Sequence, residues 1–500
     1  METRGATAPV LRVSRLASLT VATKQRGAIA VWLGIATALA AWIVLILILA
    51  SGFRAEDLAA AGHIPLAWTA LVVISAVILI GFFTRGVRID LGRRFPWIVF
   101  ALSVLVSLGT WLVLAAGNEA LAASIYRGLR IPQGIVQFWD MSLVMLSVDC
   151  ARFGFDIYQD NNGCMQDASI YAPGMVWLRF MPFSLFSQDN VPALGAALIV
   201  VSSLALAWLA RQSTGSGQIV LAIAAVGAPW VLLLERGNID AVVLVVLVAG
   251  IATTRRWSDS LIAWFVAAGG FWLMGTWKYY PFVLGLALLP VLRLRRGWTV
   301  IAAYLIAAFG YLVVTWQNFL FSSQSNSNMI DFGDWAVLGR VPLVARMIDA
   351  TPGAEGLQVM DIPVIALTLL AITWGVAVAR ALPMRRMSMA ALASAASALY
   401  LASVFVAGFG YGYKAAFLLA GVPLIASFLN RGTDQRARAL VGSSIAVLVL
   451  IAVQSVIMWN TVLATSAGLI AAGFLLGAGT AITLAGVLPA VVKSRQSLKA

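Results

Sequence analysis

The sequence LLLERGNIDAVVLVVLV, residues 232–248, joins two apolar runs through a short polar turn. Each run is apolar enough to lie in lipid, and a tight turn between two such helices needs only flexible residues such as Gly or Asn. This turn also carries Glu235, Arg236 and Asp240 beside Asn238. An ionised side chain at the edge of the hydrocarbon is unfavourable unless it is paired or functional. The stretch therefore predicts a helical hairpin whose turn is a candidate site.

The rest of the chain is equally apolar. Hydrophobic residues make up 61% of it and charged residues only 11%, against about 25% charged residues in soluble domains. Runs long enough to cross roughly 30 Å of hydrocarbon recur throughout. We predict an all-α polytopic membrane protein with about 14 transmembrane helices. The predicted spans are roughly 29–50, 66–84, 96–116, 190–210, 217–235, 238–253, 259–275, 280–293, 298–316, 361–380, 388–407, 414–428, 439–458 and 467–490.

The distribution of charge predicts the orientation. With both termini in the cytoplasm, the inner loops hold most of the 34 lysines and arginines, as the positive-inside rule requires. The inner loops then hold few acidic residues, namely Glu2, Asp90, Asp259 and Asp434. No small-residue cleavage site follows the first apolar run, so we expect a retained span in the plasma membrane. The basic residues are not gathered with aromatic ones on a polar surface, which argues against a nucleic-acid partner.

Two long polar segments fall outside the cytoplasm, and the first contains a short apolar stretch at 174–186 that we interpret as a re-entrant or interfacial helix. The predicted organisation of the chain is a cytoplasmic segment at 1–28, three transmembrane helices at 29–116, an extracytoplasmic loop at 117–189, transmembrane helices at 190–316, a second extracytoplasmic loop at 317–360, C-terminal transmembrane helices at 361–490 and a cytoplasmic tail at 491–500.

The first outer loop contains the two cysteines of the chain, Cys150 and Cys164. Disulfides persist outside the cytoplasm, so we predict that these residues are bonded, with two unpaired thiols as the alternative. Asp140 lies in the same loop, in IVQFWDMSLVML at 135–146. A carboxylate at the membrane surface with one dry side has a raised pKa and can act as a base. The alternative is that Asp140 caps the helix that follows it.

Three tight outer turns each present a cation. They are ERGNID at 235–240, GTWKYYPFV at 275–283 and AGFGYGYKAAFLL at 407–419. Taken singly, each could reflect a snorkelling side chain or the aromatic belt of the membrane interface. Taken together, they indicate an anionic ligand at the outer rim of the bundle. The residues concerned are Arg236, Lys278 and Lys414, with Tyr279, Tyr280, Tyr411 and Tyr413 beside the two lysines.

The order of these motifs resembles the C-type (GT-C) membrane glycosyltransferase superfamily. Within it the chain is similar to the polyprenyl-phosphate-sugar-dependent bacterial hexosyltransferases, formerly a domain of unknown function. The resemblance covers roughly residues 135–430. The matching elements are Asp140, DIY at 156–158, YAPG at 171–174, RGNID at 236–240, KYYP at 278–281 and YGYK at 411–414.

Two departures from the family pattern leave alternatives open. Asp140 follows the third predicted span rather than the first, so Glu56 and Asp57 in FRAEDL are alternative catalytic acids. The turn Tyr171-Ala172-Pro173 has one proline where many relatives have two.

The resemblance implies a GT-C-like fold whose outer loops form the active site. It implies transfer of a sugar, with inversion, from a polyprenyl-phosphate donor to a cell-envelope glycan or glycolipid acceptor on the extracytoplasmic face. The Ala-, Arg- and Val-rich composition is typical of a high-GC bacterium and favours mannose or arabinofuranose. The implied roles are a base for Asp140, donor-phosphate binding for Arg236, Lys278 and Lys414, and sugar or acceptor binding for Glu235, Asn238, Asp240, Tyr171, Tyr279, Tyr280, Tyr411 and Tyr413.

No cofactor is expected, because the donor is already activated and the membrane lipids deliver it laterally. The alternative is a divalent cation bound by Asp140 with Asp149 or Asp156. Three other classes compete with the enzyme: a polytopic transporter or flippase, a polysaccharide polymerase or ligase for lipid-linked glycans, and a non-catalytic subunit of an assembly. Transporters place charges or broken helices near mid-membrane, whereas nearly every charge here maps to the end of a predicted span. Polymerases and ligases usually depend on outer-loop histidines, and this chain has one histidine.

Overall fold

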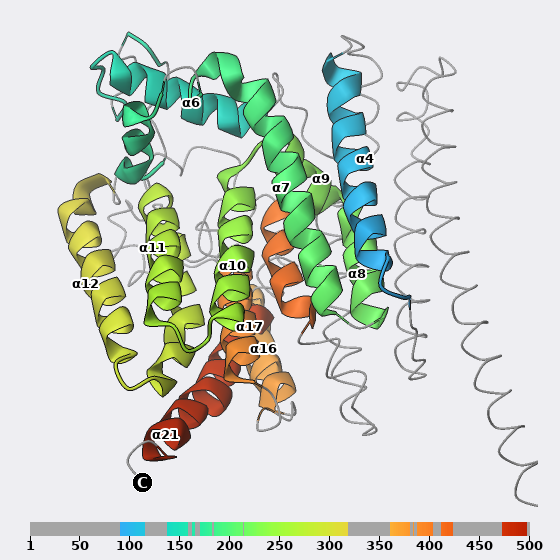
Figure 1. The fold of residues 1–500 in the computed structure, drawn as a ribbon, viewed down its shortest axis with the longest axis vertical. Helices are drawn as coiled ribbons and strands as arrows, with labels where there is room; N and C mark the ends of the chain where they lie inside the picture. Colours follow the sequence, from blue (N-terminus) through green and yellow to red (C-terminus); the bar gives the residue numbers. More distant parts are fainter. Residues whose placement is uncertain are drawn as a thin grey trace, which may run out of the picture.

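The computed structural model describes residues 91–115, 138–158, 163–165, 171–182, 185–213, 215–318, 361–380, 384, 388–403, 412–423 and 473–497. Within these ranges the regular structure is helical and no strand occurs (Figure 1). Its first half consists of α4 (Phe95–Ala115), α6 (Trp139–Arg152), η1 (Pro173–Phe180), η2 (Gln188–Asn190), α7 (Val191–Gln212), α8 (Gly215–Ala225), α9 (Ala228–Glu235) and α10 (Ile239–Arg256). There follow α11 (Leu261–Trp277), η3 (Tyr280–Arg293), α12 (Trp298–Val314), α16 (Asp361–Arg380), α17 (Met389–Ser403), η6 (Gly412–Gly421), η7 (Thr483–Val487) and α21 (Leu488–Ser497).

The apolar helices indicate a membrane protein. Among the described residues, three stretches are long and apolar enough to cross a membrane, namely Phe95–Leu112, Gln188–Gln212 and Gly473–Val492. Shorter apolar helices accompany them, at Leu261–Trp277, Tyr280–Arg293, Trp298–Val314, Thr368–Arg380 and Met389–Ser403. The predicted all-helical class is confirmed for this part of the chain. The number of spans and their orientation stay predictions, and the predicted spans at 29–50, 66–84 and 439–458 lie outside the described residues.

One predicted span differs from the structure. The single helix expected over 217–235 is divided into α8 and α9, with Val226 and Gly227 between them. Pro229 lies in the first turn of α9, where its missing N–H is harmless, but it cannot continue a helix from the preceding turn. The Trp230 and Val231 N–H groups donate instead to the Gly227 carbonyl, at 3.1 and 3.0 Å. Apolar composition alone did not reveal this break.

The helices form an upright bundle, and α6 lies across one end of it (Figure 1). Inside the bundle, polar side chains join neighbouring helices. Trp230 Nε1 of α9 donates to Ser103 Oγ of α4 at 2.8 Å, and Ser103 Oγ lies 2.6 Å from Ser203 Oγ of α7. All three residues are buried. In a membrane, burying apolar side chains between helices gives little driving force, because lipid is equally apolar. Hydrogen bonds between polar side chains then help to hold the helices together.

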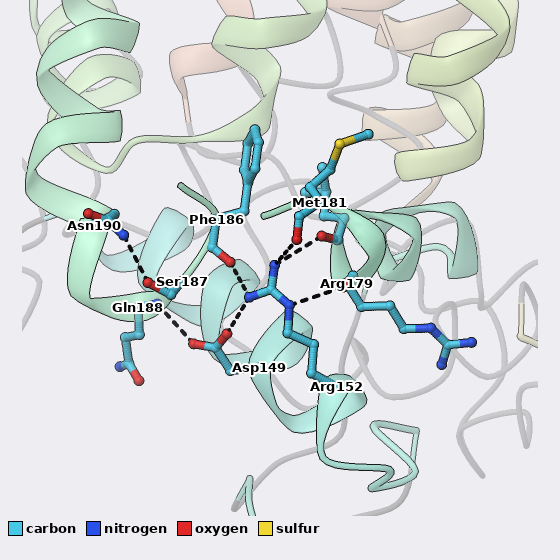
Figure 2. A network of polar contacts seen from close by, with 9 residues as sticks. Asp149, Arg152, Arg179, Met181, Phe186, Ser187, Gln188 and Asn190 are labelled. Carbon is cyan, nitrogen blue, oxygen red and sulfur yellow. Dashed lines mark hydrogen bonds and ion pairs between the residues drawn. The ribbon is translucent and has the colours of Figure 1, made fainter. Parts of the chain in front are cut away.

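The C-terminal end of α6 is fixed by the guanidinium of Arg152 (Figure 2). Arg152 pairs with Asp149 at 2.8 Å, and the other Asp149 oxygen accepts the Gln188 N–H at 2.9 Å. The positive charge meets the carbonyl end of η1, where a helix carries its partial negative charge. Arg152 thereby joins α6, η1 and the segment leading into α7. Its carbonyl partners are those of Leu178, Arg179, Met181 and Phe186.

A disulfide joins Cys150 of α6 to Cys164, with their Cα atoms 5.8 Å apart. The prediction of a bonded pair is therefore confirmed, and the alternative of unpaired thiols is wrong. Around the bond, Ala151, Ile157 and Met165 are buried in a small cluster of their own. The disulfide and the Arg152 contacts thus constrain the same end of α6.

We expect the Arg152→Met substitution to lower the free energy of unfolding by about 2–3 kcal/mol, because Asp149 loses its charged partner and the carbonyls of η1 lose their donor. The apolar stem of the side chain is retained, so packing changes little. The measurement is the unfolding transition of the purified protein in detergent. The control is Arg179→Met, an exposed arginine that lies 4.7 Å from the Phe180 ring centroid. Equal losses in the two variants would contradict the role given to Arg152.

Candidate functional site

The N-terminus of α6 contacts the C-terminus of α9. The Phe138 N–H donates to the Glu235 carbonyl at 3.2 Å, and the Asp140 N–H donates to the Arg236 carbonyl at 3.0 Å. The first N–H groups and the last carbonyls of a helix have no partner within that helix. Here the first N–H groups of α6 donate to the last carbonyls of α9, and the opposite partial charges of the two helix ends attract. This contact places the turn of residues 235–240 at the start of α6.

Two unusual backbone conformations make the contact close. Phe138 has φ 51° and Gly237 has φ 59°, both in the left-handed region. A Cβ at residue 237 would lie 2.9 Å from Met141 Cβ and 3.2 Å from Phe138 Cβ. Only glycine accepts both this conformation and this proximity. The Phe138 ring is buried and packs against Gly195 of α7, where a larger residue would meet the ring.

The Asp140 side chain lies in the first turn of α6 and turns toward α9. Its Oδ1 accepts hydrogen bonds from Arg236 Nε at 3.0 Å and Nη2 at 2.7 Å. Its Oδ2 accepts one from the Asn238 side-chain amide. The residue before α6 is Phe138, and no side chain caps the helix there. The alternative interpretation of Asp140 as a helix cap is therefore wrong, since its carboxylate binds Arg236 and Asn238, in the turn between α9 and α10.

Asn238 connects two ion pairs. Its amide nitrogen donates to Asp140, while its Oδ1 accepts the Asp240 N–H at 2.9 Å and the Lys278 ammonium at 3.2 Å. The bond to the Asp240 N–H is the N-terminal cap of α10, the role for which asparagine is favoured. Asn238 thus starts α10 and links the carboxylate of α6 to the end of α11.

The second ion pair joins Lys278 and Asp240 at 2.7 Å. Asp240 is only 1% exposed, and its Oδ1 also accepts the Tyr280 hydroxyl. The Lys278 ammonium lies 5.6 Å from the Tyr171 ring centroid and 5.9 Å from that of Tyr280. Aromatic faces at such distances attract a cation. Lys278 is therefore held by one carboxylate, one amide oxygen and two rings.

The turn that contains Tyr171 also lies beside Lys278. The Ala172 N–H donates to the Trp277 carbonyl at 3.1 Å, next to Lys278. Tyr171 is 6% exposed. Burial raises its pKa, and the nearby Asp140 and Asp240 carboxylates raise it further. Its hydroxyl is therefore protonated at neutral pH.

We call Asp140, Arg236, Asn238, Asp240, Lys278, Tyr171 and Tyr280 the charged cluster. Other predicted site residues lie around it or elsewhere. Glu235 is buried, and its carbonyl joins the contact between α6 and α9. Tyr279 turns toward α12, where its hydroxyl donates to the Thr315 carbonyl at 3.3 Å.

The late cationic turn approaches the cluster through η6. The Phe417 ring, 1% exposed, packs edge-on against Tyr280 with 6.4 Å between ring centroids. Lys414 and Tyr413 belong to η6, but the described part of the chain does not include their side chains. Tyr411 and the alternative acids Glu56 and Asp57 also lie outside the described residues.

The acids named for a divalent cation are not gathered. Asp149 pairs with Arg152 near the other end of α6, and an Asp156 oxygen accepts the Tyr158 N–H at 3.0 Å. In the ranges that the structure describes, no group of three or more His, Cys, Asp or Glu residues is arranged to hold a metal. The charged cluster itself contains two carboxylates and two cations.

Three contacts were not anticipated by the sequence analysis. They are the direct pair of Asp140 with Arg236, the hydrogen bond from Tyr280 to Asp240, and the Arg152 network. Only the first left a signal, since Asp140 and Arg236 were expected to serve one ligand.

The chain matches no family model, no curated protein and no solved structure. The charged cluster is the feature that indicates which chemistry the protein can perform. Two cations within one polar network can bind an anion, and a carboxylate beside them can accept a proton. The same group of residues thus has the parts needed to bind an anionic leaving group and a hydroxyl nucleophile.

We expect Gly237→Ala to destabilise the protein more than Gly154→Ala. Both glycines have positive φ, 59° and 85°, so each alanine carries a strain of about 1–2 kcal/mol. A Cβ at residue 154 meets nothing within 4 Å, whereas one at 237 meets Met141, which adds about 1–3 kcal/mol. The two unfolding transitions, measured in the same detergent, give the comparison. Equal destabilisation by the two substitutions would show that the contact of Met141 with residue 237 adds no cost.

Proposed function

We propose that the protein is an integral-membrane glycosyltransferase. It moves a sugar from a polyprenyl-phosphate donor to a glycan or glycolipid acceptor of the cell envelope, on the extracytoplasmic face of the plasma membrane. One observation carries the proposal. The Asp140 carboxylate lies 2.7 Å from the Arg236 guanidinium, and Asn238 bridges the same carboxylate to the Lys278 ammonium.

The proposed reaction is a single displacement. Asp140 takes the proton of the acceptor hydroxyl, whose oxygen then bonds to the anomeric carbon of the donor sugar. The bond between that carbon and the phosphate oxygen breaks, and its electron pair stays on the phosphate. Arg236 and Lys278 stabilise the negative charge that develops there. One base and no nucleophilic carboxylate give inversion at the anomeric carbon.

The remaining residues of the cluster suit the recognition of a sugar. Asp240 can accept hydrogen bonds from sugar hydroxyls, and Asn238 can accept or donate them. Tyr171 and Tyr280 present aromatic faces beside them. Lys414, on η6, would supply a third cation to the donor phosphate, and Glu235 would orient Arg236. Mannose and arabinofuranose are the proposed sugars. The donor is activated by its own phosphate, so the reaction draws on no nucleotide or cofactor.

A transporter of lipid-linked glycans is the second candidate. The observation that favours it is the break between α8 and α9, because discontinuous helices line the substrate sites of many transporters. The C-terminus of α9 also ends at the charged cluster. Reconstitution in liposomes separates the two functions, since a transporter moves labelled lipid-linked sugar between leaflets without forming a new glycosidic bond.

Purified protein in lipid nanodiscs should transfer label from polyprenyl-phosphate-mannose or polyprenyl-phosphate-arabinofuranose to an envelope glycolipid acceptor. The Asp140→Asn variant should lose at least about a hundredfold in rate, because the amide cannot accept the proton. Arg236→Gln should lose a similar factor through the leaving group. Product formation is measured by thin-layer chromatography of the labelled glycolipid.

The control is Asp189→Asn, which removes an exposed acid that does not belong to the charged cluster. It should leave the rate within about twofold of the wild type. Full activity of Asp140→Asn would reject Asp140 as the base and turn attention to Glu56 and Asp57. No transfer by the wild type from either donor would contradict the proposed sugars.

A further inference from the structure

Asp140 is the proposed base and Arg236 the proposed ligand of the donor phosphate, and the two residues form an ion pair in this structure. Arg236 donates to Asp140 through both Nε and Nη2, and the Asn238 amide occupies the second carboxylate oxygen. Both oxygens of the Asp140 carboxylate are therefore already bonded, and an acceptor hydroxyl can take the place of a partner only if that partner leaves. The pairing in this form of the protein therefore opposes the proton transfer that the proposed reaction needs.

We propose that the donor phosphate releases Asp140 by taking over Arg236. In this structure Arg236 holds Asp140 in an ion pair. The donor phosphate is a diester with one negative charge and two non-bridging oxygens, so it can bind the planar fork of the guanidinium in place of the carboxylate. When it binds, Arg236 turns to the phosphate, and the Asp140 carboxylate becomes free to accept the acceptor proton. This exchange rests on the proposed function and makes donor binding a precondition for acceptor activation.

The geometry allows this exchange without rebuilding the site. The Arg236 carbonyl accepts the Asp140 N–H, so the backbone contact between α6 and α9 stays in place while the guanidinium changes partner. The guanidinium side chain is 11% exposed, unlike the almost fully buried Asp240 carboxylate. Asn238 keeps its hydrogen bond to Oδ2 and holds the carboxylate in orientation. Only one of the two bonding partners of Asp140 has to leave.

The Asp149–Arg152 pair on the same helix provides a comparison. Its separation is 2.8 Å, and its side chains are 13% and 11% exposed, close to the 2.7 Å, 9% and 11% of Asp140 and Arg236. Arg152 also donates to backbone carbonyls of η1 and of the segment before α7. A phosphate would have to displace all of these contacts. The two pairs are alike in charge and burial, and the Arg152 guanidinium differs in being held by these backbone carbonyls as well.

The test is the affinity of the purified full chain, in detergent, for farnesyl phosphate, measured by isothermal titration calorimetry. Asp140→Asn removes the carboxylate that competes for Arg236, so it should bind farnesyl phosphate about tenfold more tightly than the wild type. Asp140→Ser, which removes the same charge with a shorter side chain, should show the same tightening. Arg236→Gln should bind at least about tenfold more weakly. The exchange thus predicts that Asp140→Asn transfers sugar more slowly than the wild type but binds farnesyl phosphate more tightly.

Two controls separate the exchange from general charge effects. Asp149→Asn should leave the affinity unchanged or lower it. Farnesol, which lacks the phosphate, should bind the wild type and Asp140→Asn equally. Tightening by Asp149→Asn, or of farnesol by Asp140→Asn, would overturn the exchange by showing that any lost carboxylate strengthens binding.

The proposed function and the exchange fail in different ways. If neither the wild type nor the Asp140 variants bind farnesyl phosphate, the polyprenyl-phosphate donor is rejected and the exchange with it. If the wild type binds it and transfers sugar, but both Asp140 variants bind it no more tightly, the function stands and the exchange alone is overturned. Folding of each variant is checked by its unfolding midpoint before the titration.

Discussion

The end of α9 and the start of α6 bond to each other through their backbones, and the charged cluster depends on that contact. The Arg236 carbonyl receives the Asp140 N–H, so the two residues that form the ion pair are also joined by main-chain atoms. Gly237 permits the approach because a side chain there would meet Met141. Asn238 then begins α10 and bonds to both Asp140 and Lys278. A single turn thereby fixes four charged side chains from α6, α9, α10 and the end of α11.

The contacts of Cys150 and Arg152 support this arrangement from the other end of α6. The guanidinium of Arg152 holds the last turn of that helix (Figure 2). The disulfide of Cys150 holds the same turn. A helix fixed at both ends presents Asp140 to Arg236 in a defined geometry. Such preorganisation lets charged groups act without the cost of reordering them during a reaction.

Much of this could be predicted from the sequence, for identifiable reasons. The helices α4, α7, α10, α11 and α12 follow long apolar runs, and the polar turn of residues 235–240 is visible because charges are rare in such a chain. The break before α9 was missed because apolar composition dominates over a single Gly-x-Pro signal. The Asp140–Arg236 pair was missed as a contact because it joins residues far apart in the sequence, and no local pattern encodes the angle at which α6 crosses the bundle. The Arg152 network has the same long-range character, since its partners are backbone carbonyls that any sequence supplies.

The central claim is that the charged cluster binds the phosphate of a lipid-linked donor. The most direct measurement is a cryo-electron microscopy map of the protein with farnesyl phosphate in nanodiscs. The account predicts the phosphate within hydrogen-bond distance of the Arg236 guanidinium and the Lys278 ammonium, with Asp140 no longer bonded to Arg236. A phosphate bound elsewhere, with the Asp140–Arg236 pair intact, would contradict it.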